Sequence, residues 1–398
     1  MGDTAPTIMG SEASIAERTA TCAHAAAIPW HVWCLAVAVA SDAFGGYWDI
    51  SWHISIGRDS FWTAPHMMVY MAGILSGISC GYAILTTTFG PSRELKDRSV
   101  AIWGFRGPLG CFVATWGALA MLISAPFDNW WHNAYGLDVK IISLPHSILA
   151  LGETMVGLGA ILLVCAQVNR TSGQYQQKFD RLLLCIGGIE VFGAALLALE
   201  STPVAFMHRA GFYRAMASTF PIVLIALSFV SKSKWPATTM AAIYTAGFLA
   251  CLWIFPLFPA EPKLGPVYQH ITHMIPLWFP TLLMAPAFAL DLLRQQLGER
   301  WGNWKSAVVA GCVYLAVFIA VQWPLADFLM SPLARNRIFG TTYFAYFDPA
   351  NIVYNPYQFV RMDTPAAFCG GMAAAFVTAI IFCSIGMALG NWMSKVQR

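Results

Sequence analysis

Residues 147–166 read SILALGETMVGLGAILLVCA, a run with one charged side chain, Glu153. An α-helix of that length is about 30 Å long, which matches the hydrocarbon core of a bilayer. Comparable apolar runs occur at 66–85, HMMVYMAGILSGISCGYAIL, and at 374–393, AAFVTAIIFCSIGMALGNWM. These runs predict transmembrane helices rather than a β-barrel.

The composition of the whole chain supports this prediction. Of 398 residues, 58% are hydrophobic and 11% are charged, and the mean hydropathy is +0.59. That leaves too little polar surface to cover a water-soluble globule. The ten cysteines occur singly and never as CxxC or CxxCH, so we interpret them as small core residues. The net charge is only +3 and basic tracts are absent, so we expect the lipid bilayer, and no nucleic acid, as a partner.

We therefore predict an all-α polytopic transmembrane helical bundle. The polar residues 1–27 lack the basic start of a signal peptide and are interpreted as a cytoplasmic tail. Residues 28–392 are interpreted as a single integral membrane domain, followed by a basic tail, 393–398. The ten predicted spans are 28–45, 65–88, 104–124, 145–168, 182–200, 215–231, 237–258, 273–291, 306–323 and 366–390.

The distribution of Lys and Arg predicts the orientation of this bundle. With the N-terminus in the cytoplasm, most of the 23 Lys and Arg residues fall in cytoplasmic segments. Both termini are then cytoplasmic, and a bacterial cytoplasmic membrane is the expected location. Most of the histidines then lie at or near the periplasmic ends of helices, namely His53, His66, His132, His146, His208, His270 and His273.

The spans pair into five helical hairpins in series, and the first two carry nearly the same phrase at their outer connection. DISWHISIGRDSFWTAPH (49–66) and DNWWHNAYGLDVKIISLPH (128–146) both contain Asp, Trp, His, Gly, Asp, Pro and His in that order. The segments are hairpin 28–90, hairpin 104–168, diverged hairpins within 182–323, a long aromatic-rich outer loop at 324–365, and the last span at 366–392.

The spacing inside each copy predicts that three side chains meet. Asp49 and His53 are four residues apart, so a continuing helix presents both on one face. His66 follows Pro65, a residue favoured in the first turn of a helix, and Thr63 stands at the expected N-cap. Each hairpin thus brings an Asp and a His from its first helix against a His that opens its second. The second copy has the matching set Asp128, His132, Ser143, Pro145 and His146.

Two imidazoles and one carboxylate are suitable ligands for copper, zinc or non-haem iron, and this ligand set does not choose among them. A helix N-terminus disfavours imidazolium, which favours neutral, ligating histidines there. Carboxylates near a ligand commonly orient its second ring nitrogen. The candidate ligands are Asp49, His53 and His66 at a first site and Asp128, His132 and His146 at a second, with Arg58, Asp59 and Asp138 as neighbours that orient or support them.

The first copy extends to a longer motif, Asp49-x3-His53-x4-Arg58-Asp59-x-Phe61-x3-Pro65-His66-x3-Tyr70. It resembles the metal-binding segment of the C subunit of the copper-dependent membrane monooxygenases, the particulate methane and ammonia monooxygenases. In that family the aspartate and the two histidines at this spacing bind copper, so the resemblance implies a copper site here. The second copy departs from the motif, with one extra residue before its proline and Leu137 where Arg58 stands. The resemblance covers only residues 49–70, and implies a standalone or differently partnered relative.

Further polar residues in or near the predicted spans are weaker candidates. Glu153 lies two helical turns from His146, roughly 10 Å, which suits a proton relay, and Glu190 and Glu200 have similar settings. A lone histidine at a helix end is more often a hydrogen-bonded interface residue than a ligand. The weaker candidates are Glu153, Glu200, His208, His270 and His273.

Three functions remain open from the sequence. A copper oxidoreductase of the monooxygenase type, or its metal-bearing subunit, requires a separate electron donor and further membrane subunits, because the chain contains no haem or flavin motif. A metal-ion or small-molecule transporter is favoured by the internal repeats. A non-catalytic subunit of a membrane complex is the third. The plainest interpretation is a duplicated hairpin whose histidines bridge helices, with Arg58 paired to Asp59 and the tryptophans in an interfacial belt.

Overall fold

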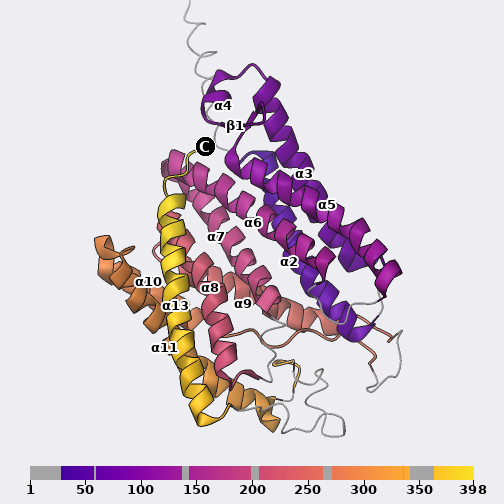
Figure 1. Cartoon of the computed structure of the whole chain (residues 1–398), viewed down its shortest axis with the longest axis vertical. Helices are drawn as coiled ribbons and strands as arrows, with labels where there is room; N and C mark the ends of the chain where they lie inside the picture. The colour runs from indigo at the N-terminus through magenta and orange to yellow at the C-terminus, as the bar shows by residue number, and fades with distance from the viewer. Residues whose placement is uncertain are drawn as a thin grey trace, which may run out of the picture.

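The computed structural model describes residues 28–57, 60–136, 143–198, 206–262, 271–334, 336–340 and 363–398. Nearly all of this chain is helical (Figure 1). The α-helices are α2 (Trp30–Ser55), α3 (Ala64–Phe89), α4 (Arg93–Asp97), α5 (Leu109–Tyr135), α6 (Leu144–Arg170), α7 (Gly173–Ala198), α8 (Ala210–Val230), α9 (Pro236–Ile254), α10 (Met284–Leu297), α11 (Trp304–Met330) and α13 (Pro365–Met393). Short 3-10 helices are η3 (Phe255–Leu257), η4 (Gly298–Arg300) and η5 (Pro332–Ala334), and β1 (Val100–Ile102) and β2 (Phe105–Gly107) form an antiparallel hairpin.

The described residues contain 8 helices that are long and apolar enough to cross a membrane. They are α3, α5, α6, α7, α8, α9, α11 and α13, and they correspond to eight of the predicted spans. The predicted span 28–45 is α2, a helix of 26 residues that continues through Asp49 and His53. It is not among the eight, because its aspartates and histidines make it less apolar. The prediction of an all-α membrane bundle is confirmed.

The predicted span 273–291 is wrong. Residues 274–283 form an irregular, non-helical chain that is largely buried inside the bundle, and α10 begins only at Met284 and has 14 residues. Pro276 and Pro280 explain the break, since each lacks an N–H and disfavours helical geometry in the residue before it. The fourth predicted hairpin is therefore α9 followed by a broken span.

Hydroxyl groups on α2 form hydrogen bonds with the backbone of this non-helical segment. Tyr47, Ser51 and Ser55 recur every four residues, so they share one face of the helix. The Leu277 N–H donates to the Tyr47 hydroxyl (2.9 Å), and the Ile275 N–H donates to Ser55 Oγ (2.7 Å). Ser51 Oγ donates to the Ile275 carbonyl (2.6 Å). Non-helical backbone is tolerated at membrane depth where protein groups satisfy it in this way.

Side chains of α9 and α11 also accept hydrogen bonds from the backbone of this segment. The Thr281 N–H donates to the Tyr244 hydroxyl of α9 (3.1 Å), and the Leu282 N–H donates to Gln322 Oε1 of α11 (3.0 Å). Gln322 is completely buried. Single polar side chains of the apolar helices α2, α9 and α11 thus form hydrogen bonds with the backbone of this one non-helical segment.

Replacing Tyr47 by phenylalanine tests this support. The ring is fully buried and stays in its aromatic cluster, but the Leu277 N–H loses its acceptor. A buried amide without a partner costs about 1–3 kcal/mol, so we expect a lower thermal unfolding midpoint for Tyr47→Phe in detergent. Tyr82→Phe is the control, because Tyr82 is 49% exposed on α3. Equal midpoints for wild type and Tyr47→Phe would show that the hydroxyl does not hold the segment.

The helices pack as two connected groups. The hairpins α2–α3 and α5–α6 meet through α3 and α5, α2 and α6 contact α7, and α7 contacts α9 (Figure 1). In the other group α8 and α11 both pack on α13. The last predicted loop, 324–365, begins too early, because α11 continues to Met330 despite Pro324. Residues 341–362 of that loop lie outside the described part of the chain.

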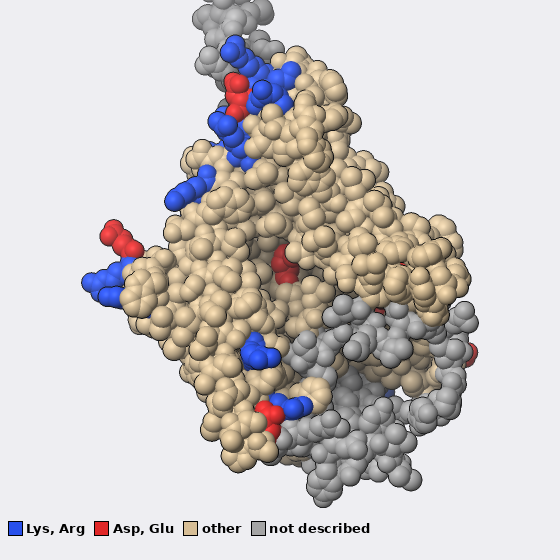
Figure 2. Space-filling model, in the orientation of Figure 1, with Lys and Arg blue, Asp and Glu red and all other residues tan. Residues whose placement is uncertain are grey.

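Charge is unevenly distributed over the surface. Basic side chains gather at the upper end of the molecule, around α4 and the β1–β2 hairpin (Figure 2). The middle of the same face is uncharged, apart from acidic atoms at the bottom of a hollow. Such a belt is typical of a membrane-embedded surface. The basic residues of α4 and the hairpin are Arg93, Lys96, Arg98 and Arg106.

Candidate metal centres

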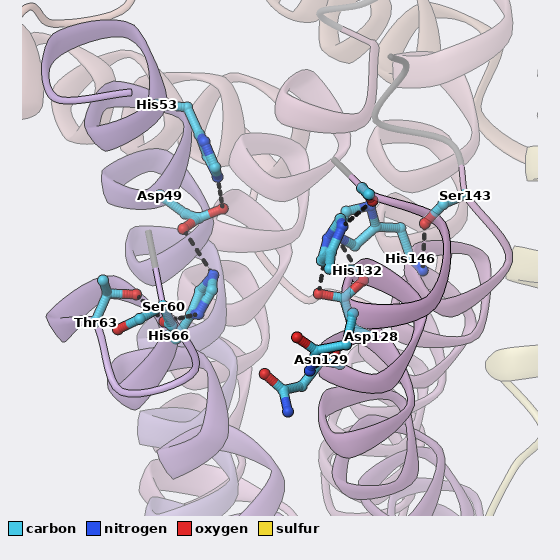
Figure 3. Close-up of polar contacts among 12 residues, drawn as sticks. Asp49, His53, Ser60, Thr63, His66, Asp128, Asn129, His132, Ser143 and His146 are labelled. Atoms are coloured by element: carbon cyan, nitrogen blue, oxygen red, sulfur yellow. Dashed lines mark hydrogen bonds and ion pairs between the residues drawn. The ribbon is translucent and has the colours of Figure 1, made fainter. Parts of the chain in front are cut away.

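The two predicted ligand sets form two clusters, each at the end of a hairpin where its two helices are connected (Figure 3). Asp49 and His53 occupy the last two turns of α2, and His66 lies in the first turn of α3. Asp128 and His132 lie in the last turns of α5, and His146 in the first turn of α6. We call the first cluster centre 1 and the second centre 2.

In centre 1 the carboxylate lies between the two imidazoles (Figure 3). His66 Nε2 is 3.2 Å from Asp49 Oδ1, and His53 Nε2 is 3.7 Å from Asp49 Oδ2. The side chain of His53 is 49% exposed, whereas that of His66 is 20% exposed. Centre 1 is therefore open on the His53 side.

Centre 2 is more compact. His132 Nε2 is 3.4 Å from Asp128 Oδ2, and His146 Nε2 is 3.5 Å from Asp128 Oδ1. One ligand atom from each residue lies within 4.8 Å of the other two, which suits a single bound ion. Among the described residues, no other group of three His, Cys, Asp or Glu side chains is gathered this tightly.

Backbone carbonyls fix the orientation of three of the imidazoles. His53 Nδ1 lies 3.1 Å from the Gly57 carbonyl, and His132 Nδ1 lies 3.0 Å from the Gly136 carbonyl. A carbonyl oxygen only accepts, so each Nδ1 carries the proton and donates it. His66 Nδ1 donates in the same way to the Ser60 carbonyl (3.0 Å). The neutral form of each ring then directs the lone pair of Nε2 toward the aspartate, as in metal-bound histidines.

One carboxylate oxygen of each centre has no hydrogen bond to a described residue. Asp49 Oδ1 and Asp128 Oδ1 are buried, and neither has a hydrogen bond within the described structure. Each still lies within 3.5 Å of an imidazole Nε2. Buried carboxylate oxygens normally have a partner, and at centre 1 the acceptor Nε2 of His66 faces an acceptor oxygen of Asp49, a repulsion that a cation between them would relieve. The residues of centre 2 thus form a group that could hold a metal ion, and centre 1 has the same residue types in a looser arrangement.

Two glycines make the carbonyl contacts possible. Gly57 and Gly136 follow α2 and α5 and have φ angles of 93° and 87°, which only glycine adopts without strain. Thr63 and Ser143 both occupy the predicted N-cap positions. Only Ser143 caps through its side chain, which accepts from the His146 N–H (3.3 Å), whereas the Thr63 hydroxyl donates to the Ser60 carbonyl (2.9 Å).

Of the other predicted site residues, those that the structure describes do not join the two centres. His273 contacts its neighbour Thr272 (2.9 Å) and is exposed. The carbonyls of Gly57, Ser60 and Gly136 orient ligand imidazoles, a role that the sequence could not assign because main-chain groups give no signal in it. Arg58, Asp59, Asp138, Glu200 and His270 lie outside the described residues.

His208 has a partner far along the chain. Its Nε2 is 2.7 Å from Asp327 Oδ1 on α11, and its ring packs edge-on against Trp323. His208 is 6% exposed, so it ties the start of α8 to α11, as expected of a histidine at a helix interface. Asp327 was not predicted as its partner, because 119 residues separate the two.

The next residue makes a similar link. Arg209 Nε and the Ala210 N–H both donate to Asp363 (3.0 Å each), which joins the start of α8 to the start of α13. Burial opposes ionisation of Asp363, but these hydrogen bonds and the Arg209 charge outweigh it and lower its pKa. Both links are structural and lie outside the metal centres.

Comparison with known proteins adds no relative to this description. No protein-family model matches the chain, and neither curated proteins nor solved structures give a match. Function is therefore argued from the two centres and the helices around them.

Proposed function

We propose that this membrane protein binds copper at two Asp/His/His centres and acts as an oxidoreductase or as the metal-bearing subunit of one. The observation that carries the proposal is the arrangement around Asp128. Its buried Oδ1 has no hydrogen bond among the described residues, although His146 Nε2 lies 3.5 Å away. His132 Nδ1 is already committed to a carbonyl, so its Nε2 is free to face the carboxylate.

Copper is proposed because of the donor set and the resemblance together. Imidazole nitrogens suit copper, zinc and iron alike. The resemblance of residues 49–70 to the copper segment of the membrane monooxygenases favours copper at centre 1. Centre 2 has the same residue types at a related spacing, so we assign it the same metal. Bound copper would supply one-electron redox chemistry at these positions.

The protein residues define what such centres can do. Three protein ligands leave coordination positions free for a substrate or oxygen, as in catalytic rather than purely structural metal sites. The exposed side of His53 gives access to centre 1. Electrons must come from a separate donor, since the chain lacks a haem or flavin motif. We infer that the basic end faces the cytoplasm and the centres face the periplasm of a bacterial inner membrane.

A second candidate is a metal-ion carrier, and one observation favours it. Residues 274–283 form a broken span held by side chains of α2, α9 and α11. Discontinuous spans next to internal repeats are typical of secondary transporters. A carrier predicts saturable uptake of copper or zinc into proteoliposomes, which an oxidoreductase does not show.

The proposal is tested by metal analysis of the purified protein. We expect copper bound at the two centres, with nitrogen hyperfine splitting in the electron paramagnetic resonance spectrum of the Cu(II) form. His53→Ala/His66→Ala and His132→Ala/His146→Ala should each remove one of two bound ions. Zinc or iron retained in preference to copper would refute the copper assignment, and an absence of bound metal in wild type after reconstitution would refute both centres and leave a non-catalytic subunit.

A further inference from the structure

Three carboxylates interact electrostatically in the middle of the bundle, away from both centres. Asp42 lies halfway along α2, Glu153 on α6 and Glu190 on α7, and these three helices contact one another. Asp42 interacts electrostatically with both glutamates, and the two glutamates interact with each other. We call the three residues the acidic cluster.

One oxygen of the acidic cluster is buried and lacks, among the described residues, the hydrogen-bonding partner that would be expected. Asp42 Oδ1 is fully buried and makes no hydrogen bond to any residue that the structure describes. Gly157 of α6 leaves the space that the Glu190 carboxylate occupies, because a Cβ at Gly157 would overlap it. The fold thus accommodates a second acid beside the first at a depth where acids are expensive.

Basic side chains do not offset this charge. α2 has no Lys or Arg, Arg170 ends α6, and Lys178 and Arg181 lie in the first turns of α7, far from Glu190 along the helix. Of the neighbouring helices, α3 and α9 have none, and Arg214 of α8 is exposed. Three carboxylates in a medium of low dielectric therefore require protons or bound cations.

The geometry favours protons over a metal ion. A metal ion requires its ligand atoms to converge, and the tightly gathered group in the described chain is Asp128, His132 and His146. The three acids are spread over three helices and do not converge in this way. Acidic groups at membrane depth commonly belong to proton relays, in which hydrogen bonds or bridging waters carry the proton between carboxyls.

The cluster also leads to the centres. Asp42 and Asp49 are seven residues apart on α2, and His146 and Glu153 are seven apart on α6, which is two turns or roughly 10 Å in each case. Glu153 also interacts electrostatically with Asp49. We propose that Asp42, Glu153 and Glu190 form a proton relay between the middle of the bundle and the two metal centres, an inference that rests on the proposed function. In each step the O–H bond of one carboxyl breaks as an O–H bond forms on the next.

The first experiment tests whether the carboxyl groups of the acidic cluster are protonated. Dicyclohexylcarbodiimide reacts with protonated carboxyl groups in apolar surroundings, and peptide mass spectrometry locates the product. We expect labelling at Glu153 or Glu190 in wild type, its loss in Glu153→Gln or Glu190→Gln, and none at the exposed Glu299. An unlabelled cluster in the folded protein at neutral pH would overturn the relay, because its carboxyls would then hold no proton to pass on.

The second experiment measures proton movement. Copper-loaded protein in vesicles is reduced with a chemical reductant, and an indicator dye follows the coupled proton uptake. We expect Glu153→Gln, Glu190→Gln and Asp42→Asn to slow uptake, by roughly 100-fold for the most critical acid, with unchanged copper content. Glu299→Gln should match wild type. Unchanged rates in all three variants would overturn the relay while the centres stand, whereas wild-type protein without copper would show that the proposed function itself has failed.

Discussion

Asp128→Ala should lose the metal of centre 2 while the bundle remains folded. The carboxylate contacts both imidazoles of the centre, at 3.4 Å and 3.5 Å, and supplies its only negative charge among the described residues. Without it two neutral imidazoles remain, and we expect the affinity to fall by more than about 100-fold, beyond the effect of losing an outer hydrogen bond. Equilibrium dialysis followed by metal analysis measures this directly.

Two variants separate ligand loss from damage to the helix. Asn129→Ala changes the next residue, which is exposed on the same turn of α5, and should retain the metal. Asp128→Asn keeps an oxygen but removes the charge, so an intermediate affinity is expected. Asp49→Ala should have the matching effect at centre 1 and leave centre 2 occupied. Full metal content in Asp128→Ala would show that the carboxylate is not a ligand.

Both centres could be predicted from the sequence because their geometry is local. The spacing of four residues places Asp49 and His53 on one helix face, and Pro65 sets the start of the next helix. A hairpin with a short connection then brings the third ligand close without any distant contact. The same spacing argument applies to Asp128, His132 and His146 in the second copy. Gly57 and Gly136 turn the chain after the first helix of each hairpin.

Other features depended on distant parts of the chain and could not be predicted in this way. The apolar residues 273–291 look like a span, and only Pro276 and Pro280 signalled the break. The hydroxyls of α2 that support the segment come from residues more than 200 positions earlier, such as Tyr47 for Leu277. Asp42 had no motif around it, and its coupling to Glu153 and Glu190 exists only once α2, α6 and α7 pack together.

Helices α5 and α6 pack closely through glycines. Gly110 and Gly117 of α5 face Gly159 and Gly152 of α6, and the backbones touch where these residues meet. A Cβ at Gly117 would lie 2.6 Å from the Gly152 carbonyl oxygen and 2.7 Å from the Val156 nitrogen. Backbone atoms of a packed helix cannot move aside, so any side chain here must push the helices apart.

Gly117→Leu should therefore unfold at a markedly lower temperature, with a loss of more than about 3 kcal/mol. Leucine is a better helix former than glycine, so a loss cannot come from helix propensity. Gly81→Leu on α3 is the matched control, because a Cβ at Gly81 meets no atom within 4 Å.

The two arms of centre 2 lie on these same helices, Asp128 and His132 on α5 and His146 on α6. Separating the helices should release the metal of centre 2 before that of centre 1, whose ligands come from α2 and α3. Metal analysis of Gly117→Leu at temperatures below its unfolding transition checks this order. Equal loss from both centres would mean that the two hairpins respond as one rigid unit, and an unchanged centre 2 would mean that its ligands do not depend on the glycine contact.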